Sequence, residues 1–119
     1  MDEGRTQDHK NPYYNLGIFY AARARASIGL VYSQRGRYDE ALQEFKKALE
    51  VNPELPDLHY YLGIVYENLG RFEEAMDELK AAIEINPEYI EARCHLAICL
   101  HDTGKQSEAK TELRRAIDY

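Results

Sequence analysis

An Asn-Pro pair occurs at positions 52–53 and again at 86–87, and much of the sequence between the two pairs recurs at this spacing of 34 residues. The segment 28–32 reads IGLVY, the segment 62–66 reads LGIVY, and the segment 96–100 reads LAICL. A period of this length is typical of a unit of two helices that cannot bury its apolar face alone and must stack on copies of itself. The sequence therefore predicts a function carried by a surface rather than by an enclosed pocket.

One glycine in each repeat marks the turn between two predicted helices: Gly36, Gly70 and Gly104. Glycine adopts positive φ without steric cost, which lets one helix end and the next turn back. After each turn, small and large apolar residues alternate at helical spacing, as expected for a closely packed second helix. These positions are Ala41, Ala75 and Ala109, then Phe45, Leu79 and Leu113, then Ala48, Ala82 and Ala116. We expect helices near residues 13–35, 38–51, 56–69, 72–85, 90–103 and 106–118.

This pattern resembles the tetratricopeptide repeat over roughly residues 22–119. The signature of that family places an aromatic residue, Leu-Gly, Tyr, Ala, Phe and Pro at fixed offsets. The second repeat departs from it with His59 for the aromatic residue and Leu79 for Phe, and the other two repeats carry Arg25 and Arg93 at the aromatic position. Because the Gly, Ala and Pro positions constrain the backbone, we expect these departures to matter little for the fold.

The resemblance implies an all-α, right-handed α-solenoid of helix-turn-helix repeats. A single domain is expected over residues 13–119, with repeats at about 22–55, 56–89 and 90–119. Residues 1–12 are polar and are expected to form a flexible N-terminus.

The charge of the chain disfavours nucleic acid as a partner. Lys and Arg total 15 against 21 Asp and Glu, a net charge of −6. Residues 54–87 contain eight acids and two bases, whereas residues 13–53 sum to +2. A nucleic-acid-binding protein needs a basic face that displaces phosphate counterions. We therefore predict no nucleic-acid partner.

Membrane insertion and secretion are also not predicted. No stretch of the sequence is long and apolar enough to span a bilayer, and residues 1–12 lack the apolar core of a signal peptide. Cys94 and Cys99 lie about 140° apart around a predicted helix, too divergent to bond each other. Reduced thiols fit a reducing compartment. The expected location is the cytoplasm.

Catalytic and metal-binding motifs find little support. The glycines fall singly at repeat intervals instead of forming a phosphate-binding cluster. The histidines show no repeated pairing with acids or nucleophiles. His95 shares a helix face with Cys99, and Cys94 shares another with His101, but a structural metal site needs about four converging ligands. We expect no enzymatic activity, no metal and no cofactor.

The first helix of each repeat lines the concave groove in this family, and the side chains expected there differ in kind between repeats. We interpret such variable positions as free of packing, so that the apolar ones need a partner to cover them; a merely solvated face is the alternative. Tyr60, Tyr61, Ile64 and Ile98 would form an apolar floor. Four acids are expected around it: Asp57, Glu67, Glu91 and Asp102. A protein or peptide with apolar anchors and basic character is the predicted partner. The predicted groove residues are Leu30, Asp57, Tyr60, Tyr61, Ile64, Glu67, Asn68, Cys94, His95, Ile98 and His101.

Some members of the family hold the C-terminal carboxylate of heat-shock chaperones with a clamp of Lys, Asn and Arg. Here the clamp positions carry Ala26 and Leu30 in the first repeat, Tyr61 in the second, and Glu91 and His95 in the third. An acidic, aromatic groove repels a carboxylate. The sequence therefore does not predict a chaperone carboxylate clamp.

The first helix is expected to be two turns longer than the others. Pro12 precedes Pro53 by 41 residues, seven more than one repeat, and seven residues are two helical turns. A helix that is apolar on nearly all sides needs burial all round. A homodimer through this extension is therefore expected; packing on an upstream repeat, or back onto the first repeat, are the alternatives. The apolar residues of the extension are Tyr13, Tyr14, Leu16, Ile18, Phe19 and Tyr20.

The last predicted helix is partly polar, since Gln106 and Lys110 stand where the second repeat has Phe72 and Met76. The sequence leaves open whether the array ends there. The favoured function is a non-catalytic protein-interaction scaffold that binds a peptide or helix in its groove. A structural module for self-assembly, or one part of a longer array, is the alternative.

Overall fold

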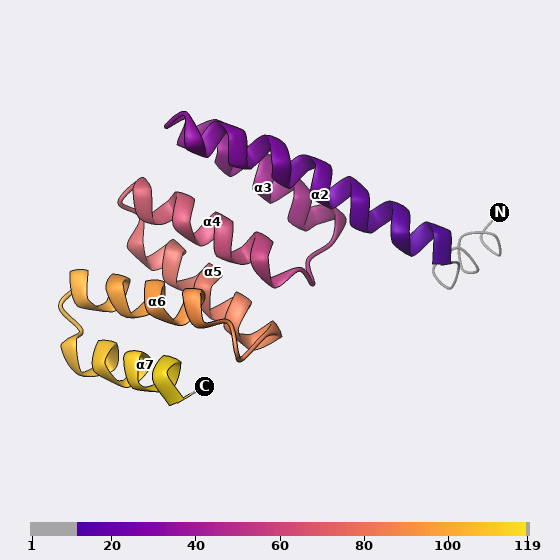
Figure 1. Cartoon of the computed structure of the whole chain (residues 1–119). Coiled ribbons are helices and arrows are strands. Elements are labelled where there is room, and N and C mark those ends of the chain that lie inside the picture. Colours follow the sequence, from indigo (N-terminus) through magenta and orange to yellow (C-terminus); the bar gives the residue numbers. More distant parts are fainter. Residues whose placement is uncertain (1–11, 119) are drawn as a thin grey trace.

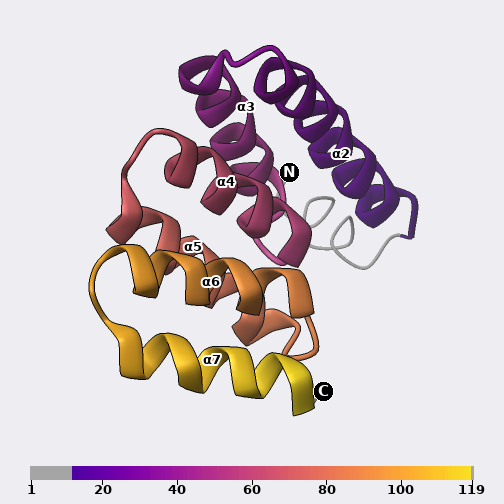
Figure 2. The ribbon, with the colours of Figure 1, turned by 60° about the vertical axis from the view of Figure 1, so that its left-hand side comes forward.

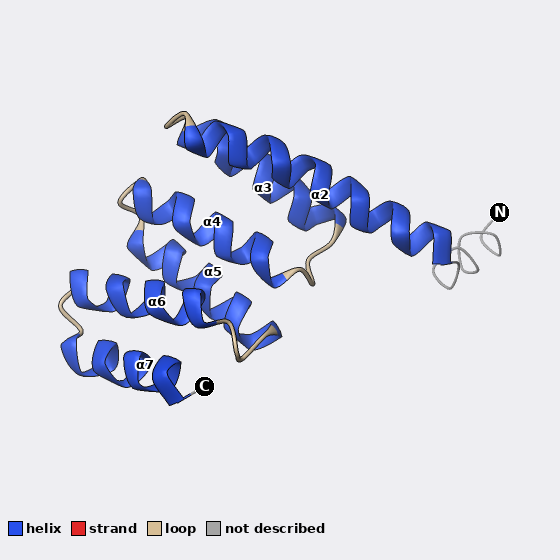
Figure 3. Cartoon of the chain, in the orientation of Figure 1, coloured by secondary structure: helices blue, strands red, loops and turns tan. Residues whose placement is uncertain are grey.

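The computed structural model describes the backbone of residues 12–118 and the side chains of residues 15–118. The expectation for residues 1–12 thus falls almost entirely outside the described residues. The described part folds into helices without strands (Figure 1, Figure 3). The helices are α2 (Pro12–Gln34), α3 (Tyr38–Val51), α4 (Pro56–Asn68), α5 (Phe72–Ile85), α6 (Ile90–Asp102) and α7 (Gln106–Asp118). Their bounds agree with the expected ones to within one residue.

The helices form three hairpins that stack along one direction. α2 packs on α3, α4 on α5 and α6 on α7, and the hairpins meet where α3 contacts α4 and α5 contacts α6 (Figure 1, Figure 2). α2, α4 and α6 lie in one layer, and α3, α5 and α7 lie in the other (Figure 1). The predicted groove residues all belong to the helices of the first layer, which we call the groove layer. No helix of the described residues has the length and apolarity to cross a membrane.

The turn inside each hairpin has the same geometry. Gly36, Gly70 and Gly104 have φ of 73°, 74° and 82°, a region that other residues rarely adopt. After the first two turns, the backbone N–H of Arg37 and of Arg71 donates to a tyrosine carbonyl five residues earlier, each at 2.9 Å. The connections between hairpins repeat as well, since the side chains of Asn52 and Asn86 accept backbone N–H groups two residues on. The repeated sequence therefore fixes the repeated turns.

Close contact between the two helices of a hairpin depends on a glycine in the first two repeats. A Cβ atom on Gly29 would lie 2.9 Å from the ring of Phe45, and one on Gly63 would lie 3.0 Å from Cγ of Leu79. Phe45 and Leu79 are completely buried. These contacts confirm that the alternation of small and large residues packs the first two hairpins. In the third repeat the glycine position is occupied by Ala97.

The lengthened first helix is present. α2 has 23 residues, whereas the other helices have 13 or 14. Leu16, Phe19 and Tyr20 are exposed and Ile18 is half-buried. Tyr13 and Tyr14 belong to α2, but their side chains lie outside those the structure describes.

Candidate protein-binding groove

Tyr60 lies at the centre of an aromatic cluster on the α2, α4 and α6 layer. Its ring centroid lies 5.7 Å from that of Tyr61, 5.1 Å from that of Tyr89 and 5.6 Å from that of His95. Tyr60 and Tyr61 belong to α4, His95 belongs to α6, and Tyr89 directly precedes α6. The cluster therefore joins the second and third repeats. Its members are half-buried, so part of each ring reaches the surface.

The interpretation of the groove residues as free of packing is wrong for three of them. Tyr61 stacks on the buried ring of Phe45, with the centroids 5.7 Å apart. Leu30, Tyr60 and Tyr61 are all partly buried against the hydrophobic core. A position whose residue type varies between repeats can therefore still be packed. Replacing Tyr61 will therefore affect the fold as well as the surface.

The other predicted groove residues vary in exposure. Ile98 is exposed, whereas Ile64 and Cys94 are half-buried. The Asn68 amide donates to the carbonyl of Ile64 at 2.9 Å, which holds its side chain on its own helix. His101 lies 3.0 Å from the side chain of Gln106 on α7, away from the aromatic cluster.

Two of the four acids expected around the apolar floor have partners within the chain. Both guanidinium Nη atoms of Arg23 donate to the carboxylate of Asp57, which links α2 to α4. The carboxylate of Glu67 lies 3.1 Å from Nδ1 of His95, which links α4 to α6. Glu91 and Asp102, the other two acids, are exposed. The groove layer therefore offers less free negative charge than the sequence suggested.

Tyr60 and Tyr89 stay neutral at physiological pH, because the pKa of each is raised. Burial, followed by nearby carboxylates and phenols, raises the pKa of Tyr60. The pKa of Tyr89 is raised strongly, again mainly by burial. A neutral phenol presents an apolar ring and a hydroxyl that donates a hydrogen bond, which suits contact with a peptide backbone.

A second, repeated ion pair lies within each hairpin. Arg25 pairs with Glu44 at 3.3 Å in the first, His59 with Glu78 at 2.8 Å in the second, and Arg93 with Glu112 at 3.4 Å in the third. The cation occupies the family's aromatic position, and the acid follows it by 19 residues each time. The prediction that the histidines show no repeated pairing with acids is therefore wrong for His59.

The environment of His59 matches that of Arg93. Nδ1 of His59 faces Glu78 and Nε2 faces the carbonyl of Pro53 at 2.8 Å. Nε of Arg93 donates to the carbonyl of Pro87 at 2.9 Å. Because both ring nitrogens of His59 face acceptors, both must carry hydrogen for the two bonds to form together. Accordingly, the hydrogen bond that His59 donates to Glu78 raises the pKa of His59 against the opposing effect of burial.

Models of repeat families match the chain over three adjoining or overlapping stretches. One described as TPR repeat matches residues 29–70, and two described as tetratricopeptide repeat match residues 56–89 and 90–119. The chain belongs to the tetratricopeptide repeat family. The all-α solenoid expected from the sequence is confirmed. Comparison with curated protein sequences finds no similar one.

Solved structures of TPR proteins share this fold. A point mutant of MamA is 30% identical with a TM-score of 0.76, and the match covers 82% of this chain and 72% of that one. Another MamA structure is also 30% identical with a TM-score of 0.76, but only 56% of its chain is covered. The first TPR of Spaghetti (RPAP3), bound to the HSP90 peptide SRMEEVD, is 26% identical with a TM-score of 0.80, covering 82% of this chain and 77% of that one.

Sequence analysis missed two residues of the groove layer. Tyr89 precedes its helix and lies outside the positions compared between repeats. Arg23 is equivalent to Asp57, 34 residues later, so the opposite charges at one repeat position were the signal for this ion pair.

Cys94 and Cys99 are free thiols, and burial raises the pKa of Cys99 to about 12. Among the described residues, no three His, Cys, Asp or Glu side chains are grouped so as to hold a metal ion.

Proposed function

We propose that this TPR chain is a non-catalytic scaffold that binds an extended or helical protein segment along α2, α4 and α6. The partly exposed cluster around Tyr60 supports the proposal, with Ile98 exposed on the same layer. Aromatic residues with low conformational freedom are strong anchors at protein interfaces, each contributing about 2 kcal/mol or more when desolvated. The cluster joins two repeats, so a bound segment would cross both.

The favoured partner has apolar anchors and basic side chains. Glu91 and Asp102 are exposed, and a basic segment would be steered toward them. The similar RPAP3 structure holds an acidic peptide. At the clamp positions of this chain, Ala26 is buried, Tyr61 packs on Phe45 and His95 pairs with Glu67. We therefore infer that an acidic C-terminal peptide is not its ligand.

A selection of random displayed peptides on the purified chain tests this proposal. We expect enrichment of sequences that combine two or more apolar residues with Lys or Arg. Calorimetric titration of an enriched peptide should show a roughly 30-fold weaker affinity for Tyr60→Ala, the equivalent of about 2 kcal/mol. Tyr20→Ala, which removes an exposed tyrosine outside the groove, is the matched control. Unchanged affinity in Tyr60→Ala, or equal binding of SRMEEVD, would contradict the proposal.

A second candidate function is self-association through the extension of α2. It is favoured by the exposed side chains of Leu16, Phe19 and Tyr20. A two-fold dimer is the commonest closed assembly for such a surface. If this candidate holds, light scattering should show a dimer for the whole chain and a monomer for Phe19→Asp and for a chain starting at Ala21. A monomer in all three cases rules this candidate out.

We further propose a cytoplasmic location. Cys99 is buried and Cys94 is half-buried, and neither forms a disulfide. Free thiols of this kind persist in a reducing compartment. Fractionation of cells that express the tagged chain would check the location.

A further inference from the structure

The two ends of the solenoid expose the two halves of an interface that occurs twice inside the chain. At each internal joint, the first helix of one repeat packs on the second helix of the repeat before it, as α4 does on α3 and α6 on α5. The residues of these joints recur every 34 positions. The outermost copies of both halves therefore have no neighbour within the described chain.

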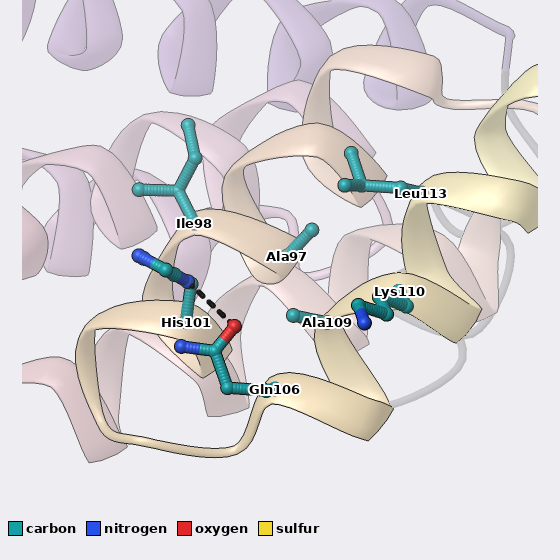
Figure 4. Close-up of a pocket in the computed structure, with 7 residues that line it drawn as sticks. All are labelled: Ala97, Ile98, His101, Gln106, Ala109, Lys110 and Leu113. Atoms are coloured by element: carbon teal, nitrogen blue, oxygen red, sulfur yellow. Dashed lines mark hydrogen bonds between the residues drawn. The ribbon is translucent and has the colours of Figure 1, made fainter.

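One half is the surface between α6 and α7, which we call the tail face. It encloses a hollow of about 390 Å³ (Figure 4). Leu113 and Ile98 border this hollow, and the exposed Lys110 replaces the buried Met76 of the second repeat. Leu113 is 46% exposed, whereas the equivalent Leu79 is completely buried. Ile117, near the end of α7, is 82% exposed, whereas the equivalent Ile83 packs against the core.

The other half is the outer side of α2, which we call the head face. Ile28 and Val31 are 45% and 46% exposed. The equivalent residues of the second repeat, Leu62 and Val65, are buried where α4 meets α3. Ala24 is exposed, whereas its equivalent Leu58 is buried. The head face thus repeats the apolar pattern that fills an internal joint.

A cation and an aromatic residue at the two ends also match a pair that meets across an internal joint. Across the first internal joint, the ammonium of Lys46 lies 5.9 Å from the ring centroid of Tyr66. Positions equivalent to these two residues are Arg114 on α7 and Tyr32 on α2. A cation and an aromatic ring would therefore face each other if the tail face met a head face.

The groove layer carries matching charges at the two ends. Arg23 pairs with Asp57 in the next repeat, and the third residue of this series is Glu91. If a second copy of the chain continued the repeat after α7, Arg23 of that copy would lie beside Glu91. Opposite charges at the two ends favour this register over others.

We propose that the tail face binds the head face of a second copy of this chain, continuing the repeat across the junction. The contact is heterologous, so it leaves one free end on each side and generates open, concentration-dependent chains. This assembly differs from a two-fold dimer through residues 13–20, in which identical surfaces meet. It does not depend on what the groove binds.

Two complementary variants test the proposal by sedimentation velocity over a range of concentrations. The head variant carries Ile28→Asp and Val31→Asp, and the tail variant carries Leu113→Asp and Ile117→Asp. We expect the unchanged chain to form a series of oligomers and each variant alone to be monomeric. An equimolar mixture should form a dimer and nothing larger, because only one intact head and one intact tail remain in each pair.

Ile90→Asp is the control, since Ile90 is 43% exposed but does not border the hollow of the tail face. It should associate like the unchanged chain. Circular dichroism melts show whether each variant is folded. If the head variant is unfolded, Val31→Lys alone takes its place; if the tail variant is unfolded, Ile117→Lys alone takes its place. A monomeric unchanged chain overturns the proposal, as does a mixture that stays monomeric or a tail variant that still associates.

Discussion

The second and third repeats carry leucine at the same position, yet the two side chains have different environments. Leu79 is completely buried because α6 packs on α5, whereas Leu113 lies at the open tail face and is half-exposed. The alanines around them are buried in both repeats, at Ala75 and Ala82 as at Ala109 and Ala116. The alanines are thus buried in both hairpins, and the exposure of the two leucines differs because only α5 is covered by a further repeat. In a solenoid, what a residue contributes depends on whether another hairpin covers it.

The largest expected difference between these repeats is in the cost of truncating the two leucines. Leu79→Ala should lower the free energy of unfolding by about 2–5 kcal/mol, because it leaves a cavity in the core. Leu113→Ala should cost about 1 kcal/mol or less, because only part of the side chain is removed from water. Urea unfolding at concentrations where the chain is monomeric measures both. Equal losses would contradict the half-exposed position of Leu113 in the single chain.

A smaller difference is expected when the small residue of each hairpin is enlarged. Gly63→Val should destabilise the chain by about 1–3 kcal/mol, because the new atoms would meet Leu79 and the carbonyl of Ala75. Ala97→Val should cost less, because Ala97 borders the hollow and its neighbour Leu113 has room to move. Thermal melts of the two variants decide the comparison. A greater loss in Ala97→Val would show that the third hairpin is packed as tightly as the second.

The smallest effect concerns the repeated ion pair, where His59 in the second repeat replaces the arginine of the third. The pKa of His59 is raised above its unfolded value of about 6.5, mainly by Glu78. Its protonation therefore stabilises the fold fully below about pH 6.5, and this contribution is lost as the pH rises through the folded pKa. Since the pair is partly exposed, we expect this contribution to the free energy of unfolding to be under about 1 kcal/mol.

The unfolding free energies of the unchanged chain and of His59→Arg, measured from pH 5 to 9, test this effect. The difference between them should shift in favour of the arginine variant as the pH rises. Glu78→Gln in the unchanged chain should remove most of the pH dependence that His59 causes. A difference that stays constant with pH would show that the pKa of His59 does not change on folding.

The 34-residue period was enough to predict the helices, their pairing and the turn glycines. Local chemistry sets these features, since the chain must turn back at Gly36, Gly70 and Gly104 and must pack alanines against larger residues. The groove was harder to predict. Comparing equivalent positions found Tyr60 and Tyr61 but not Tyr89, which enters the cluster from a connection between hairpins. Variation between repeats also failed to separate packed residues from free ones, as Tyr61 on Phe45 shows.

The sequence by itself determined that this chain is a solenoid of repeated hairpins with a lengthened first helix, because spacing and residue size act within each hairpin. Only the tertiary structure decided which side chains are covered, since burial depends on a neighbouring hairpin 34 residues away. It paired Arg23 with Asp57 and His59 with Glu78, which no local pattern revealed. Leu113 is half-exposed whereas Leu79 is buried, although both are leucines at equivalent positions. The type of a residue does not determine which helix packs on it.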